Sequence, residues 1–85
     1  MPYTVLFEAA ALRALDKIRP ENRARIIARA EALAHDPFPP GYKKLRGPEG
    51  YFRIRVGDYR IVYDVQHNRL VILVIRVGHR REVYR

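Results

Sequence analysis

The sequence predicts an α+β domain in which two helices pack on one face of a four-stranded, mainly antiparallel sheet. Three observations support this fold class. A short strand pattern opens the chain, two helical patterns follow it, and three strand patterns separated by tight turns complete it. The chain has 85 residues. We therefore expect one domain, residues 1–85, because a chain of this size builds a single core.

The first half of the chain predicts one strand and a helical hairpin. Residues 3–7, "YTVLF", alternate in the manner of a strand. Residues 8–18 carry leucine and isoleucine at helical spacing, and a second helix is expected to begin near Pro20, which suits a first helical turn. Because the connection is short, the two helices are expected to run antiparallel.

The second half predicts a loop and three strands. Residues 36–50 are dense in proline and glycine and are expected to form a loop. The strands that follow are expected over residues 51–56, 59–66 and about 70–77, joined by tight turns. The order of elements is therefore β-α-α-β-β-β, and the sheet face opposite the helices is expected to be at least partly open.

Positive charge is concentrated in the second half of the chain. The net charge is +8. Residues 1–40 carry six basic and five acidic side chains, whereas residues 41–85 carry eleven basic and four acidic ones, for net charges of +1 and +7. A general solubility charge or a thermophilic bias would spread evenly. The asymmetry instead favours a polyanion or an acidic protein as partner.

The stretch "YFRIRVGDYRIVY", residues 51–63, places arginines together on one face of a predicted hairpin. If Gly57-Asp58 is a two-residue turn, alternation puts six apolar residues on the face that meets the helices. The opposite face then receives Arg53, Arg55 and Arg60. Like charges that oppose each other weaken a sheet, so this cluster favours a functional cationic surface over ordinary solvated strand residues.

Several chemistries are excluded by residue type. The sequence has no serine and no cysteine, so neither is available as a nucleophile. The glycines form no phosphate-binding loop, and the histidines have no metal-ligand spacing, so no metal and no cofactor are expected. The lack of cysteine and of any long apolar segment suits a cytoplasmic protein that does not associate with membranes.

The tail "GHRREVY" gathers further groups that suit phosphodiester chemistry. If it folds back over the open face, His79, Arg80 and Tyr84 would meet the strand arginines. Guanidinium groups bind phosphate and stabilise developing negative charge, and a group of near-neutral pKa can move protons. RNA supplies its own nucleophile, the 2′-hydroxyl. A basic sheet with tyrosines also describes a non-catalytic RNA-binding module, and the residues alone favour binding over catalysis.

Three motifs in order, "YKKLRG", "YFRIRVGDYRIVYDV" and "VGHRREVY", give the chain a family resemblance. Together with the preceding strand and helical hairpin, they resemble the RelE branch of the RelE/ParE toxin superfamily over essentially the whole chain. The resemblance implies the toxin of a type II toxin–antitoxin pair. It implies a metal-independent endoribonuclease that cuts mRNA in the ribosomal A site through attack by the 2′-hydroxyl.

The resemblance also assigns roles to residues of this sequence. The catalytic positions fall on Arg53, Arg55, Arg60, Arg80 and Tyr84, and His79 joins them as an acid–base candidate. RNA contacts are expected from Lys43, Lys44, Arg46, Tyr51 and Arg81. The best-studied pattern has lysine at the first two catalytic positions. Because arginine effectively does not deprotonate, His79 or Tyr84 is expected to carry the proton transfer here.

The resemblance implies partners and leaves two other functions open. The expected partners are a cognate antitoxin that is acidic or DNA-binding, the ribosome with its mRNA, and operator DNA only through the antitoxin. The antitoxin is expected to cover part of the helical hairpin or a sheet edge. The alternatives are a ParE-like toxin that inhibits gyrase, and a non-catalytic member that acts only in a repressor complex.

Overall fold

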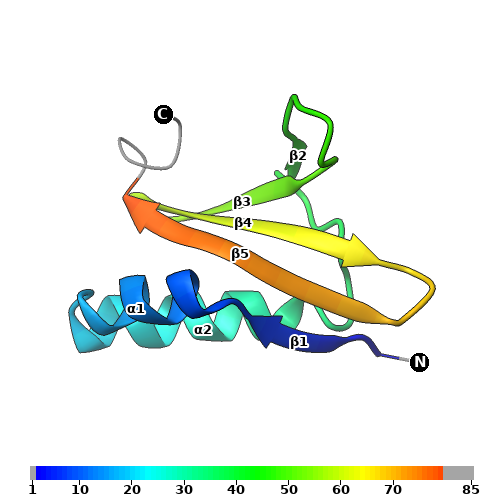
Figure 1. The fold of residues 1–85 in the computed structure, drawn as a ribbon. Coiled ribbons are helices and arrows are strands. Elements are labelled where there is room, and N and C mark those ends of the chain that lie inside the picture. The colour runs from blue at the N-terminus through cyan, green and yellow to red at the C-terminus, as the bar shows by residue number, and fades with distance from the viewer. Residues whose placement is uncertain (1, 80–85) are drawn as a thin grey trace.

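The chain forms two helices packed on one face of a five-stranded sheet, which confirms the α+β fold class (Figure 1). This computed structural model describes residues 2–79. The strand order across the sheet is β1-β5-β4-β3-β2. In chain order the elements are β1 Thr4–Phe7, α1 Ala9–Asp16, α2 Pro20–Ala32, β2 Lys43–Lys44, β3 Phe52–Val56, β4 Tyr59–Gln66 and β5 Val71–His79.

The sheet has one strand more than the sequence predicts. The extra strand, β2, lies inside the segment expected to be a loop, and it pairs antiparallel with β3 through Lys43↔Arg53 and Lys44↔Phe52. Two residues are too few to carry a periodic pattern, so only the neighbouring β3 defines this strand. At the other edge, β1 pairs with β5 in parallel, while β3, β4 and β5 are joined by antiparallel pairings.

The register predicted for the β3–β4 hairpin is confirmed. Val56 pairs with Tyr59 across a two-residue turn, and the same ladder pairs Arg55 with Arg60. Gly57 has a φ of +60°, which fits a type II′ turn with glycine at its first central position. This turn matches the right-handed twist of the strands and fixes which residues share a face.

The hydrophobic core lies between the helices and the sheet. Ala11 and Leu15 face inward from α1, and Ile26, Ala30 and Leu33 face inward from α2 and its end. The sheet supplies buried residues from its three central strands: Ile54, Val56, Ile61, Tyr63, Ile72, Val74 and Val77. Burying these side chains is the main stabilising contribution to a domain of this size.

The two helices are linked by Arg23, whose guanidinium closes the end of α1. Its Nε donates a hydrogen bond to the Leu15 carbonyl at 2.9 Å, and its Nη2 donates one to the Ile18 carbonyl at 2.8 Å. Leu15 lies in the last turn of α1 and Ile18 lies in the connection that follows it, so this side chain of α2 binds the segment that joins the two helices. Neither helix, within the part of the chain that the structure describes, is long and apolar enough to cross a bilayer.

Candidate nucleic-acid interface

The sheet face opposite the helices, here called the outer face, carries basic side chains in two cross-strand rows. The Arg53 row runs Lys43, Arg53, Val62, Arg76 over β2, β3, β4 and β5. The Arg60 row runs Arg55, Arg60, Gly78 over β3, β4 and β5. Strands lie about 4.8 Å apart, so the Arg53 row spans about 14 Å, which is long enough for a few nucleotides of single-stranded RNA.

The three strand arginines lie on the outer face, as predicted. Two of them are buried, however, although this face was expected to be open to solvent. Arg53 is 3% exposed and Arg60 is 5% exposed, whereas Arg55 is exposed. Arg53 lies between Lys43 and Val62, and Arg60 lies between Arg55 and Gly78. Arg55 has a strand on one side only, because the β2–β3 ladder stops at Arg53.

The burial of these groups fixes their guanidiniums close to the backbone. The Nη1 of Arg60 donates a hydrogen bond to the Tyr59 carbonyl at 3.3 Å. A buried charged group is costly unless it is paired, so burial of these guanidiniums requires interactions with neighbouring groups, which both residues make. The buried guanidiniums of Arg53 and Arg60 therefore lie beside the exposed guanidinium of Arg55. Arg55 makes no ion pair within residues 2–79.

The residues expected to contact RNA from the loop are divided between two faces. Lys43 belongs to the Arg53 row, whereas Lys44 pairs with Phe52 and therefore follows the opposite face of the sheet. Arg46 is exposed in the loop, and Tyr51 is half-buried at the start of β3. A backbone hydrogen bond of 2.9 Å from the Leu45 amide to the Tyr51 carbonyl holds the two ends of this loop together.

His79 lies at the end of β5, opposite Tyr59, and next to the Gly78 of the Arg60 row. Its ring meets the Tyr59 ring edge-on, with centroids 5.9 Å apart. It also lines a cavity of about 600 Å³ between α1 and the ends of β4 and β5, together with Arg13 and Lys17. The other predicted tail residues, Arg80, Arg81 and Tyr84, lie outside the described residues.

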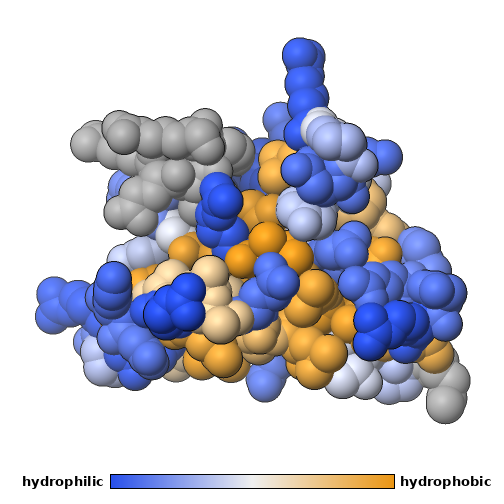
Figure 2. All heavy atoms as spheres, in the orientation of Figure 1, coloured by the Kyte–Doolittle hydropathy of each residue, from blue (hydrophilic) through white to orange (hydrophobic). Residues whose placement is uncertain are grey.

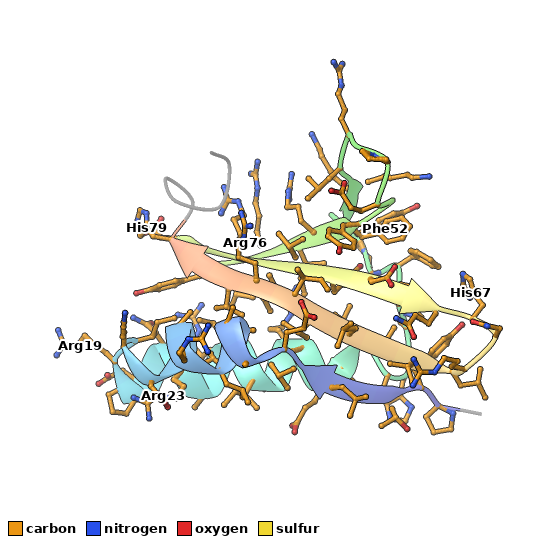
Figure 3. The ribbon with its side chains drawn as sticks, in the orientation of Figure 1. Arg19, Arg23, Phe52, His67, Arg76 and His79 are labelled. Atoms are coloured by element: carbon orange, nitrogen blue, oxygen red, sulfur yellow. The ribbon has the colours of Figure 1, made fainter. Side chains whose placement is uncertain are left out.

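Arg76 is a basic residue of the outer face that the sequence analysis did not single out. It is exposed on β5, opposite Val62, and points away from the helices (Figure 3). The register shifts between Val62 and Tyr63, so that Ile75 is an extra residue on β5. This irregularity breaks simple alternation. In the sequence, the only indication that Arg76 belongs to the outer face is that it is a charged residue within an apolar strand.

A second cavity lies on the outer face, between the loop and the sheet. Its volume is about 290 Å³. Apolar side chains form part of its wall, and hydrophobic atoms are visible at the foot of the loop in Figure 2. The lining residues are Leu45, Arg46, Glu49, Tyr51, Val62, Ile75 and Arg76. The outer face therefore combines guanidiniums with a small, partly apolar hollow.

Comparison with known proteins defines the class to which this chain belongs. The family model described as "ParE toxin of type II toxin-antitoxin system, parDE" matches residues 5–84. The toxin RelG of Mycobacterium tuberculosis is 35% identical over 86 residues, which covers 100% of this chain and 99% of that protein. The chain belongs to the RelE/ParE superfamily of toxins, in its RelE-like branch.

Solved structures agree with this assignment. The toxin–antitoxin complex RelBE2 of Mycobacterium tuberculosis contains a chain that superposes with a TM-score of 0.83 at 34% identity, covering 94% of this chain and 100% of that one. A mutant Escherichia coli toxin RelE in the free state superposes with a TM-score of 0.81 at 30% identity, covering 99% and 92%. The β-α-α-β-β-β order expected from the sequence is thus the RelE arrangement, with β2 added.

Proposed function

We propose that this protein is the toxin of a type II toxin–antitoxin pair and acts in the cytoplasm as a ribosome-dependent mRNA endoribonuclease. The observation that carries the proposal is the pair of guanidinium rows on the outer face. Arg53, Arg55 and Arg60 lie on adjacent strands in neighbouring rows. Convergent guanidiniums on a face without helices suit a phosphodiester whose negative charge increases during reaction.

The reaction we propose is an internal transesterification. The 2′-hydroxyl oxygen attacks the adjacent phosphorus, and the bond from phosphorus to the 5′-oxygen breaks. The products are a 2′,3′-cyclic phosphate and a 5′-hydroxyl. One proton leaves the 2′-hydroxyl and one is delivered to the departing 5′-oxygen. Arg53, Arg55 and Arg60 stabilise the pentavalent phosphorane charge, so the mechanism does not depend on a metal ion.

Proton transfer in this mechanism falls to residues other than the strand arginines. Arginine keeps its proton in proteins, which excludes Arg53 and Arg55 as general bases. His79 is our candidate by residue type, since an imidazole can accept and donate a proton. The register pairs it with Tyr59, so it lies on the helical side of the sheet and not beside Arg60. Tyr84 and Arg80 of the tail are the further candidates, for proton donation and phosphate binding respectively.

RNA outside the cleaved bond would be held by the loop and the tail. Lys43 continues the Arg53 row, and Arg46 is exposed above it. Lys44, Tyr51 and Arg81 complete the proposed contact set. Lysine and arginine bind RNA through its phosphates, and a tyrosine ring can stack on an unpaired base. We propose that these groups contact messenger and ribosomal RNA in the A site.

The second partner we propose is a cognate antitoxin. The solved structures that resemble this chain include an archaeal RelE–RelB complex from Pyrococcus horikoshii, at 26% identity and a TM-score of 0.83, and the intact RelBE complex of Escherichia coli. With a net charge of +8, this chain would attract an acidic antitoxin. Operator DNA would be bound only through that antitoxin.

Expression of the full chain without antitoxin tests the catalytic proposal. We expect growth and translation to stop, with mRNA cut at ribosomes. The double variant Arg60→Ala with Tyr84→Phe should reduce cleavage about 100-fold or more, because it removes one electrostatic and one proton-transfer contribution. Arg29→Ala, an exposed change on α2, is the matched control and should remain toxic.

Two outcomes would sink the catalytic proposal: a harmless wild type, or a double variant as toxic as the wild type. The description of the matching family model names ParE, so gyrase inhibition is the second candidate. Stalled gyrase and DNA damage with intact mRNA would identify it. Operator binding with the antitoxin and no toxicity would identify a member that acts only as a repressor.

A further inference from the structure

The cavity between the loop and the outer face has features that phosphate binding alone does not explain. Val62 and Ile75 contribute apolar surface from β4 and β5, and Leu45 and Tyr51 contribute from the loop. At about 290 Å³ it is close to the lower limit for small-molecule pockets. That size suits one nucleobase, and not an extended chain. Apolar walls with an aromatic ring suit the faces of such a base.

Glu49 is the acidic residue of this cavity, which two arginines, Arg46 and Arg76, also line. Its carboxylate lies close to the backbone of Gly47. A Cβ added to Gly47 would be only 2.6 Å from the Oε1 of Glu49. It makes no ion pair with any residue that the structure describes, although Arg46 and Arg76 line the same cavity. A carboxylate repels phosphate, so its place here calls for a ligand group that donates hydrogen bonds.

We propose that this cavity holds one unpaired nucleobase of the bound RNA and that Glu49 selects guanine. The Watson–Crick edge of guanine presents two neighbouring donors, N1–H and the 2-amino group, which match the two oxygens of a carboxylate. Adenine and cytosine each offer an amino group beside an acceptor, and uracil offers one N–H between two carbonyls. A carboxylate therefore favours guanine over the other three bases.

The surrounding groups complete this site. Tyr51 provides a ring for stacking, and Arg76 lies at the end of the Arg53 row, where it would neutralise the phosphate that follows the selected base. The inference rests on the proposed function, since it places a base beside the phosphate that the guanidinium rows would hold. It adds a sequence preference that originates in the toxin chain itself.

Binding of short oligonucleotides to the purified full chain tests the site without cleavage. The probes are single-stranded 2′-O-methyl uridine hexamers in which one central base is uracil, guanine, inosine, adenine or cytosine. These probes have no free 2′-hydroxyl to attack phosphorus. By fluorescence anisotropy at low salt, we expect the guanine probe to bind about tenfold more tightly than the uracil probe. Inosine, which lacks the 2-amino group, should lose most of that gain.

Two variants that each remove one negative charge decide whether Glu49 causes the preference for guanine. Glu49→Gln should bring the guanine-to-uracil ratio close to one. Glu31→Gln, at an exposed position of α2 on the helical side of the sheet, should leave the ratio unchanged. Both side chains are exposed, so neither change should impair folding. An equal rise in affinity for every probe in Glu49→Gln, without a wild-type preference, would mean simple charge repulsion and would overturn the proposal.

The remaining outcomes separate this site from the proposed function. Equal binding of the five probes by the wild type, no binding of any probe, or a guanine preference that survives Glu49→Gln would each overturn the base site. If the wild type is toxic and cleaves mRNA but shows no base preference, the endoribonuclease proposal is supported and the guanine site is wrong. If the wild type prefers guanine but is harmless, the guanine site is supported and the endoribonuclease proposal is wrong.

Discussion

At the scale of single residues, burial separates arginines that look equivalent in the sequence. Arg53 and Arg60 are almost fully buried, whereas Arg55 and Arg76 are exposed on the same face. A buried guanidinium has already lost most of its rotamer freedom. Binding an anion therefore costs it less entropy than it costs an exposed arginine. The outer face thus presents two arginines with restricted side chains, Arg53 and Arg60, and two with free rotamers, Arg55 and Arg76.

Tyr63 provides a test of burial at a single phenol. Its hydroxyl donates a hydrogen bond to the Pro37 carbonyl at 2.6 Å. Burial raises the pKa of this phenol well above its usual value, and the nearby Tyr42 and Asp36 raise it further. Replacing it by phenylalanine removes the hydrogen bond, so Tyr63→Phe should lower the free energy of unfolding by about 1 kcal/mol at neutral pH.

The same variant should change how stability depends on pH. In the folded wild type Tyr63 keeps its proton above about pH 10, whereas in the unfolded chain it releases that proton. Its contribution to stability is therefore complete below pH 10 and lost above it, by about 1.4 kcal/mol per pH unit. Denaturant titrations from pH 7 to 11 should show a shallower decline for Tyr63→Phe. Tyr51→Phe, which leaves the surroundings of Tyr63 intact, serves as control, and an unchanged slope in Tyr63→Phe would contradict the assignment.

At the scale of elements, the helical hairpin depends on one polar side chain as well as on its apolar stripe. Arg23 lies on α2 but donates hydrogen bonds to the Leu15 carbonyl of α1 and to the Ile18 carbonyl in the connection that follows. It therefore links α2 to the end of α1.

Arg23→Ala should destabilise the domain by roughly 1–2 kcal/mol, since it leaves the carbonyls of Leu15 and Ile18 without this donor in a partly exposed setting. Thermal melts should show a midpoint about 5–15 °C lower. Arg29→Ala removes an exposed arginine from the same helix and should stay within about 0.5 kcal/mol of the wild type. Equal effects of the two changes would show that the hydrogen bonds to α1 contribute nothing specific.

At the scale of the whole molecule, large apolar side chains remain exposed on both sides of the sheet. Among them are Leu6 on edge strand β1, which alternation places on the outer face because Val5 and Phe7 pack on the core, and Leu12 on α1. Their exposed fractions are 44% and 49%. Figure 2 shows hydrophobic atoms gathered over the region where β1 and α1 meet. Exposed apolar surface beside a strand edge is typical of a protein-binding site.

We expect the antitoxin to cover this region, so Leu6→Glu and Leu12→Glu should each weaken toxin–antitoxin binding about tenfold or more. Calorimetry with the purified pair measures the change. Both variants should still arrest growth when expressed alone, because neither position lies on the guanidinium rows. Glu8→Gln, between the two leucines in the chain, is the control for a local charge change. Unaltered affinity in both leucine variants would place the antitoxin elsewhere.

Much of the fold could be predicted because its signals are local. The pattern of residues 51–63 fixed the β3–β4 register, since any slip by one residue would bury the arginines in the core. Strand β2 could not be predicted, because two residues carry no period. Arg76 and Glu49 also escaped prediction. The first lies beside an irregular register, and the second comes from a loop whose path depends on glycines with positive φ.

The sequence by itself determined the order of every element except β2, the family, and the face of the sheet on which the arginines lie. These depend on alternation, turn chemistry and motif spacing, which are properties of the chain over short distances. Only the tertiary structure decided which arginines are buried and which residues surround the cavity beside them. Burial depends on neighbours brought together from β2, β3, β4 and β5, and no local pattern records those contacts.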